Sequence, residues 1–308
     1  MPDFDVIDCH AHIFQNAETG IRYQTSMGRR DQPERNGTVE EVLGFMKSLG
    51  ISQTIMLLYL PATDMFDRRV ADLPKEPRER AEATRALRED IGGRVSRYNQ
   101  WGVETGQKHP EILPFVGADP MFFTRDGLVE ELEDKHKKGA KGVKIVPMAM
   151  RIYLNDPRLW PVYDFCNRTG LPLLTQSGGG FQSGDGWDAW GRPIYLRPAL
   201  EEFKNLRVIT AHFGRGYLDD VVELANKFDG FYTDLSSQVG DWGESGHWSI
   251  EEGVEAIRKT GVDKVVYGTN YPQSDPKRYI AKLRSLPLKE SELEKIAAGN
   301  VKRVVGLS

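Results

Sequence analysis

The stretch FDVIDCHAH, residues 4–12, joins a short apolar run to two closely spaced histidines. Seven further apolar runs follow it along the chain. They are QTIMLLYL (53–60), ILPFVGAD (112–119), GVKIVP (142–147), LPLLTQS (171–177), LRVITAH (206–212), FYTDLS (231–236) and KVVYGTN (264–270). Nearly continuous hydrophobicity is typical of strands that are buried on both faces of a parallel sheet. The sequence therefore predicts eight parallel strands.

Helix signals lie between these runs. Residues 38–41 (TVEE) and 249–252 (SIEE) have the composition of capping boxes. Residues 78–108 form a long, charged stretch of helical period, and residues 290–306 predict an amphipathic helix at the end. Eight strand–helix units with right-handed crossovers predict a (β/α)8 TIM barrel, with residues 1–308 in a single domain.

Two stretches between the predicted elements look irregular. Residues 13–37 are polar, and residues 177–193 are rich in glycine and tryptophan. Both follow predicted strands, so in a barrel both leave the C-terminal face and should roof the active site. Phe181 and Trp187 offer aromatic surface there for a planar substrate, or they pack the loop on the barrel.

Composition limits the functional classes. The 308-residue chain has a formal net charge of −4 and 28% charged residues, so nothing points to nucleic acid or an anionic membrane. No apolar run approaches the ~20 residues that span a bilayer, and the first residues lack a signal-peptide pattern. Cys9 and Cys166 lie in apolar segments, which predicts that both are buried thiols. We expect a cytoplasmic protein with a small-molecule substrate, with assembly into a homodimer or homotetramer left open.

Polar residues at the predicted strand ends are the candidates for chemistry. His10 and His12 flank one alanine, and a period of two places both rings on one inward face, where they can share a metal ion. His212 ends its apolar run and is followed by Gly-Arg-Gly, which would let Arg215 clamp a carboxylate. Each of these residues also has a purely structural explanation, as a hydrogen-bonded histidine or a solvated arginine.

Lys144 and His247 are further candidates. If it points inward, Lys144 is a buried amine with a chemical role, or it forms an ion pair with an acid such as Asp8 or Asp119. His247 belongs to the loop after residues 231–236 and could reach the mouth of the barrel.

At this point the chain resembles the amidohydrolase-2 branch of the amidohydrolase superfamily. The resemblance covers nearly the whole chain. It rests on IDCHAHIF, GVKIVP, LPLLTQSGGG, YLRPALEEFKNLRVITAHFGRG, YGTNYP and GNVKRVVGL. It implies a metal held by His10 and His12 together with a histidine after the fifth strand and an aspartate after the eighth. It also implies that His212 acts as an acid or base.

Two positions depart from that pattern, because Gln176 stands where the fifth-strand histidine is expected and Asn270 where the aspartate is expected. Both are neutral amides, which are weak metal ligands and cannot serve as general bases. We therefore expect weak or no metal dependence, with Gln176 and Asn270 as hydrogen-bonding groups of the catalytic site. One alternative is a zinc or manganese ion on His10, His12 and His212. Another is a barrel that only binds a small molecule.

The resemblance also implies the type of reaction. It indicates hydrolysis of a C–O or C–N bond, as in a lactonase, or non-oxidative decarboxylation. In either case the substrate would be a small carboxylated cyclic or aromatic molecule. The candidate catalytic residues are His212, Asn270, Gln176 and Lys144. The candidate substrate-binding residues are Arg215, Trp187, Phe181 and His247.

Overall fold

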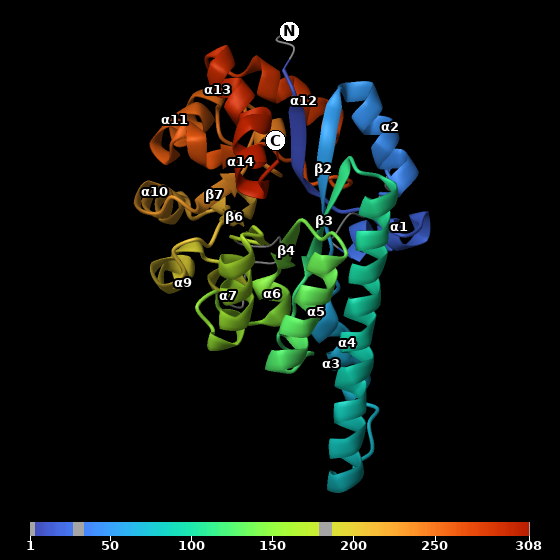
Figure 1. The fold of residues 1–308 in the computed structure, drawn as a ribbon. Helices are drawn as coiled ribbons and strands as arrows, with labels where there is room; N and C mark the ends of the chain where they lie inside the picture. Colours follow the sequence, from blue (N-terminus) through green and yellow to red (C-terminus); the bar gives the residue numbers. More distant parts are fainter. Residues whose placement is uncertain (1–3, 27–33, 179–186, 308) are drawn as a thin grey trace.

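The computed structural model describes residues 4–26, 34–178 and 187–307. Eight parallel strands form one sheet in the order β1 to β8, so each strand pairs with its neighbour in sequence (Figure 1). Their bounds are β1 Val6–Ala11, β2 Ile51–Leu57, β3 Ile112–Gly117, β4 Gly142–Ile145, β5 Leu173–Thr175, β6 Val208–Thr210, β7 Phe231–Asp234 and β8 Val265–Val266. The predicted strands and their parallel arrangement are confirmed.

Backbone hydrogen bonds between β1 and the segment after β8 complete the barrel. The Cys9 N–H donates to the Tyr267 carbonyl (3.0 Å), and the Asn270 N–H donates to the His10 carbonyl (2.8 Å). The His12 N–H donates to the Tyr271 carbonyl (2.7 Å). The segment that carries Asn270 therefore lies directly beside the two histidines of β1. The fold is the expected single-domain (β/α)8 TIM barrel.

Two apolar layers lie on opposite faces of the sheet. The larger packs the outer face of the strands against the surrounding helices. The smaller fills the barrel and includes side chains from most strands and from the last helix, among them Ile7, Phe115, Leu174, Ile209 and Val301. The last helix thus closes the end of the barrel at which the strands begin, and the polar residues gather at the other end.

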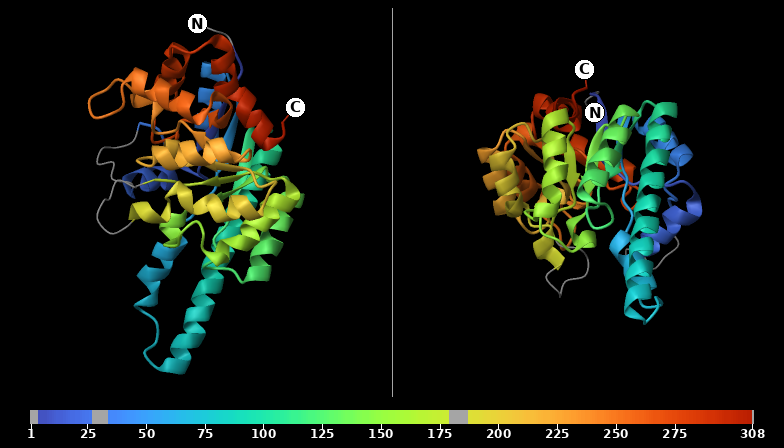
Figure 2. Two further views of the ribbon diagram at one scale, coloured as in Figure 1. Left: turned by 90° about the vertical axis from the view of Figure 1, so that its left-hand side faces the viewer. Right: turned by 60° about the horizontal axis from the view of Figure 1, so that its bottom comes forward.

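The helices cover the outside of the barrel (Figure 1, Figure 2). Their bounds are α1 Ala17–Ser26, α2 Val39–Leu49, α3 Ala62–Val70, α4 Pro77–Lys108, α5 Arg125–Lys137, α6 Pro147–Met150, α7 Trp160–Thr169, α8 Trp187–Trp190, α9 Arg197–Glu202, α10 Leu218–Lys227, α11 Ile250–Thr260, α12 Pro276–Ser285, α13 Glu290–Glu294 and α14 Asn300–Val305. A π-helical turn, Lys295–Gly299, joins α13 to α14, so the predicted terminal helix is present. In both figures α3 and the first half of α4 extend well beyond the barrel.

The two predicted capping boxes differ in the structure. At α11 the box is complete, with the Ser249 hydroxyl accepting from the Glu252 N–H and the Glu252 carboxylate accepting from the Ser249 N–H. At α2 the Thr38 hydroxyl caps the helix, but the Glu41 carboxylate accepts from the N–H groups of residues 36 and 37. The box predicted at residues 38–41 is therefore only half correct, because the preceding loop takes up the glutamate.

The prediction that residues 13–37 are irregular is wrong in part. Helix α1 forms within this stretch, because the Asn16 side chain accepts from the Thr19 N–H (2.9 Å) and so caps its first turn. Residues 27–33 and 179–186 lie outside the described residues, so the middle part of the predicted 177–193 roof does too.

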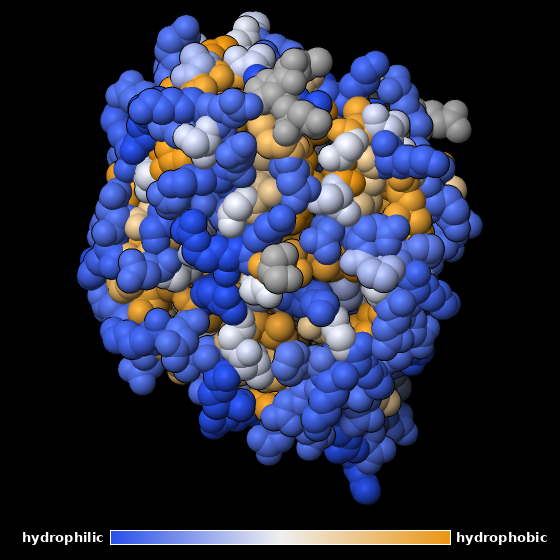
Figure 3. Space-filling model, turned by 45° about the horizontal axis from the view of Figure 1, so that its top comes forward, coloured by the Kyte–Doolittle hydropathy of each residue, from blue (hydrophilic) through white to orange (hydrophobic). Residues whose placement is uncertain are grey.

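The surface matches the charged composition. One face of the molecule is mainly hydrophilic, with apolar residues showing between the polar ones (Figure 3). Among the described residues, Tyr153 is the large hydrophobic side chain that stands exposed. None of the described helices has the length and apolar character needed to cross a membrane.

Candidate active site

The histidines at the ends of β1 and β6 form one cluster at the C-terminal end of the barrel. The rings of His10 and His12 lie 5.3 Å apart in an edge-to-face arrangement, and those of His10 and His212 lie 4.8 Å apart. All three side chains are buried. The structure thus brings together the three histidines that the sequence singled out.

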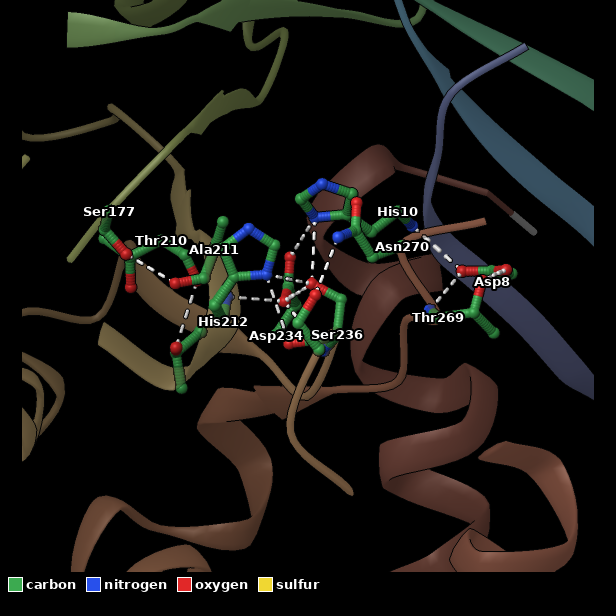
Figure 4. A network of polar contacts seen from close by, with 12 residues as sticks. Asp8, His10, Ser177, Thr210, Ala211, His212, Asp234, Ser236, Thr269 and Asn270 are labelled. Atoms are coloured by element: carbon green, nitrogen blue, oxygen red, sulfur yellow. Dashed lines mark hydrogen bonds and ion pairs between the residues drawn. The ribbon is translucent and has the colours of Figure 1, made fainter. Parts of the chain in front are cut away.

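Asp234, the last residue of β7, ties this cluster together (Figure 4). Its Oδ2 accepts from the His10 Nδ1 (2.8 Å), and its Oδ1 accepts from the His212 backbone N–H (2.8 Å). Oδ1 also accepts from the Ser236 N–H (2.9 Å) and the Ser236 hydroxyl (2.5 Å). Sequence reasoning missed both residues, although an acid at the tip of an expected barrel strand, in FYTDLS, was the available signal.

The hydrogen bonds fix the tautomers of two histidines. Nδ1 of His212 lies 3.1 Å from the Ser236 carbonyl oxygen, which can only accept, so Nδ1 carries the proton. The Ser236 hydroxyl, 2.8 Å from the same Nδ1, gives its own proton to Asp234. Nδ1 of His10 is likewise protonated toward Asp234. Each ring therefore presents an unprotonated Nε2.

Burial keeps these rings neutral. The pKa of each of His10, His12 and His212 lies well below its usual value, and burial is the main cause. The nearby charges of Lys144 and Arg215 lower the pKa of His10 and His212 further. The cluster is thus a set of neutral bases and metal-ligand candidates near neutral pH.

Lys144 lies inside the barrel. Its neighbours Val143 and Ile145 pack in the outer layer, whereas its sheet partner Leu174 belongs to the barrel interior. The side chain is 1% exposed, and Nζ has no hydrogen-bond partner among the described residues. Burial lowers the pKa of Lys144 to about 7, with Asp234 opposing the shift.

The alternative in which Lys144 pairs with Asp8 or Asp119 is wrong. Asp8 accepts from the Thr269 hydroxyl (2.5 Å) and from the N–H groups of His10 and Thr269. Asp119 accepts from the Met121 N–H (2.9 Å). Burial raises the pKa of each carboxyl to about 6, since neither has a cationic partner close enough to offset its desolvation.

Asn270 belongs to the polar frame of the site. Its Nδ2 donates to the Ser237 hydroxyl (2.7 Å) and to Oε1 of Gln273 (3.1 Å). A hydrogen bond between its side chain and the His12 ring raises the pKa of His12 against the larger effect of burial. Gln176 follows β5 directly and is half-buried, with its N–H bound to the Ile145 carbonyl. Both amides lie at strand ends, as expected.

The backbone at the tips of β6 and β8 adopts an unusual conformation. His212, Phe213 and Arg215 have φ values of 59°, 53° and 28°, and Asn270 has a φ of 69°. Positive φ is costly for residues with a side chain, and it clusters at functional sites. Asn270 tolerates it better than most residues, because asparagine visits the left-handed region readily.

Arg215 is half-buried beside the histidine cluster. It ends the short turn Ala211–Gly214 (η3) after β6, and burial lowers the pKa of its guanidinium. Gly178 packs against the Arg215 backbone so closely that a Cβ there would lie 2.4 Å from the Arg215 carbonyl oxygen. This contact fixes the start of the loop after β5 against the loop after β6.

Three predicted substrate-binding residues remain predictions. Phe181 lies outside the described residues, and Trp187 begins the short helix α8. His247 is exposed, and its N–H donates to the Glu244 carbonyl (3.1 Å). Within the described parts of the chain, no contact joins His247 to the histidine cluster.

The cluster has the donor set of a metal centre. His10, His212 and Asp234 each offer a ligand atom, and these atoms lie within 4.8 Å of one another. Nε2 of His10 is buried and has no hydrogen-bond partner among the described residues, while Nδ1 is held by a carboxylate. A metal-ligating histidine commonly has this arrangement. The residues therefore fit a divalent metal.

Comparison with known proteins agrees with this architecture. Several solved structures match over nearly the whole of both chains at low identity, which shows the shared fold. A dihydroxybenzoic acid decarboxylase from a Polaromonas species, with bound manganese and an inhibitor, has a TM-score of 0.71 at 17% identity (100% of this chain, 98% of that one). A 5-carboxyvanillate decarboxylase from Sphingomonas paucimobilis has a TM-score of 0.68 at 16% identity (99% and 100%).

A third structure comes from a hydrolase. The putative 2-pyrone-4,6-dicarboxylic acid hydrolase from Pseudomonas putida has a TM-score of 0.64 at 15% identity (100% of this chain, 99% of that one). A search of curated proteins finds no match. The amidohydrolase family model Amidohydro_2 matches residues 7–307. With its barrel and its histidine cluster at the strand ends, the chain therefore belongs to this amidohydrolase family of enzymes.

Proposed function

We propose that this enzyme acts on a small carboxylated cyclic or aromatic substrate, by non-oxidative decarboxylation in the first instance. The observation that carries the proposal is the charge of the strand ends. Arg215 lies beside three neutral histidines, and the carboxylate of this cluster, Asp234, already accepts hydrogen bonds from His10, His212 and Ser236. With its carboxylate engaged and its histidines neutral, the site has the Arg215 guanidinium as its cationic group and favours an anionic ligand.

Different residues would bind the substrate, orient it and transfer the proton in a decarboxylation. Arg215 offers a guanidinium for a carboxylate, and Gln176 and Asn270 offer amide groups that orient the ring. His212 is the proton carrier, because Ser236 holds its Nδ1–H and so directs Nε2 as the reactive atom. Loss of carbon dioxide leaves electron density on the ring carbon, and a proton that Nε2 of His212 takes up from solvent and delivers there completes the reaction.

A divalent metal would be held by His10 and His212, with Asp234 beside them, and would polarise a substrate oxygen when bound. Asp234 Oδ1 already accepts three hydrogen bonds, and Oδ2 accepts one from His10. The carboxylate therefore serves better as a support for His10 than as a ligand. A site with imidazole ligands alone and neutral amides at positions 176 and 270 should bind metal weakly.

Hydrolysis of a C–O or C–N bond is the second candidate. Its support is the unprotonated Nε2 of His212, which can take a proton from an attacking water. The structural neighbours include two decarboxylases and a putative pyrone hydrolase. The same histidine would act in either reaction.

A panel of aromatic acids and carboxylated lactones tests the proposal. Carbon dioxide release reports decarboxylation, and loss of the lactone absorbance reports hydrolysis. His212→Asn should abolish turnover, whereas His109→Asn should keep it, because His109 lies where α4 ends, at the opposite end of the barrel. Binding without turnover in the wild-type protein would favour a barrel that only binds small molecules. Full turnover in His212→Asn would overturn the assigned role.

A further inference from the structure

The deep burial of Lys144 is more than the electrostatic binding of an anionic substrate would require. It is among the largest fully buried side chains of the protein, and Nζ has no hydrogen-bond partner among the described residues. In sheet register it lies between Gly117 of β3 and Leu174 of β5, so one neighbour contributes no side chain beside it. A structural lysine in such a position would normally have an acid or a carbonyl as a partner.

Lys144 is buried among groups that leave its amine without a hydrogen bond among the described residues. When protonated, it interacts electrostatically with His10 and His12 at the end of β1, with His212 after β6 and with Asp234 of β7. Cys9, also on β1, is buried in the barrel interior. The three rings are neutral, and Asp234 is the one carboxylate in this set and is bound to His10. A desolvated lysine in this environment favours its uncharged, nucleophilic form.

We propose that Lys144 forms an imine with the aldehyde or ketone carbon of a small carboxylic acid. The proposal rests on the carboxylated substrate inferred above and narrows it to acids that also carry a reactive carbonyl group. The carboxylate would lie toward Arg215, and the carbonyl carbon toward Nζ. His212, on the same cluster, is the group available for proton transfer.

The chemistry closes without a further reactant. The Nζ lone pair attacks the carbonyl carbon, and the resulting carbinolamine loses water to form the C=N bond. When the carboxylate is on the adjacent carbon, the protonated imine takes up the electron pair of the breaking C–C bond. Carbon dioxide leaves and an enamine remains. Nε2 of His212 takes up a proton from solvent and delivers it to the enamine carbon, and water then hydrolyses the imine and regenerates the Lys144 amine.

Reductive trapping on the full chain tests this proposal. The native protein is incubated with glyoxylate or acetoacetate and then with sodium borohydride, which converts an imine to a stable secondary amine. Intact mass and peptide mapping locate the adduct. We expect one adduct per chain, on the peptide that holds Lys144. Lys144→Arg and Lys144→Met should lose it, and Lys47→Met, on the exposed face of α2, should retain it.

The outcomes separate this inference from the proposed function. An adduct on Lys144 without carbon dioxide release from any acid supports the imine and removes decarboxylation. Unchanged turnover in Lys144→Arg overturns the imine and leaves the proposed function standing. Labelling of the wild-type protein that misses Lys144, or spreads evenly over exposed lysines, also overturns the imine. Because mapping the wild-type adduct needs no variant, a misfolded mutant would not obscure the result.

Discussion

Replacing Lys144 by methionine should remove a pH dependence from the stability of the barrel. The side chain is 1% exposed, and burial lowers its pKa from 10.5 to about 7. Between these two values the unfolded chain holds a proton on Lys144 that the folded chain lacks, so stability rises with pH across this window. Below about pH 7 both states are protonated, and the folded state carries the full cost of the buried charge.

The size of the effect follows from the pKa. One pKa unit corresponds to about 1.4 kcal/mol, so moving from about pH 6 to about pH 9 should stabilise the wild-type protein by roughly 2.5 kcal/mol through Lys144. Methionine has a similar length and no charge. The advantage of the Lys144→Met protein over the wild type should therefore shrink by the same amount, while other titrating groups contribute equally to both proteins.

Urea unfolding followed by circular dichroism measures this difference. The free energies of unfolding of wild type and Lys144→Met are compared at the two pH values. Lys47→Met serves as the matched control, because Lys47 is exposed on α2 and its replacement removes no buried charge. A difference between wild type and Lys144→Met that is the same at both pH values would refute the reasoning.

Three further changes test the frame of the site. Asp234→Asn should turn His10 to its other tautomer. The amide oxygen will keep the three donors now at Oδ1, and the amide N–H group will then face the His10 ring. A ¹⁵N histidine spectrum that still showed a protonated Nδ1 would contradict this. Asn270→Asp combined with Gln176→His should raise Zn²⁺ or Mn²⁺ affinity by roughly tenfold or more in calorimetric titrations, since an anionic ligand and an imidazole are added. An unchanged affinity would mean that residues 176 and 270 do not contribute ligands to the histidine cluster. Ser249→Ala should lower the free energy of unfolding by about 1 kcal/mol, because its hydroxyl caps α11, and an unaltered chemical denaturation curve would show that the cap is dispensable.

The strand pattern alone was enough to predict the barrel. Parallel strands buried on both faces leave long apolar runs, and those runs have no simpler explanation in a chain of this composition. Their lengths were less predictable. Strand β8 is only Val265–Val266, because the chain after it turns to pair with the backbone of β1 through residues such as Asn270. Helix α1 was missed because one Asn16 cap within a polar stretch is a weak signal.

The sequence predicted the site residues that are histidines at strand ends, but it did not single out the acid at a strand end. His10, His12 and His212 stand out because histidine is rare and two of them share a strand end. Asp234 does not, since aspartates end many strands and turns. Its role depends on β7 lying beside β6 and only one strand away from β1 in the closed barrel, and this is a property of the closed sheet. Of the two roles considered for Lys144, pairing with Asp8 or Asp119 failed, because both carboxylates are bound by hydroxyl or N–H donors near their own strands.

The carboxylate preference of the strand ends is the central claim, and one binding measurement tests it directly. Calorimetric titration compares benzoate with benzamide, which has the same ring and no charge. The wild-type protein should bind benzoate and discriminate against benzamide by at least about tenfold. Arg215→Gln should lose that discrimination, and Arg125→Gln, at an exposed arginine on α5, should keep it. Equal binding of the acid and the amide, or a discrimination that survives Arg215→Gln, would contradict the claim.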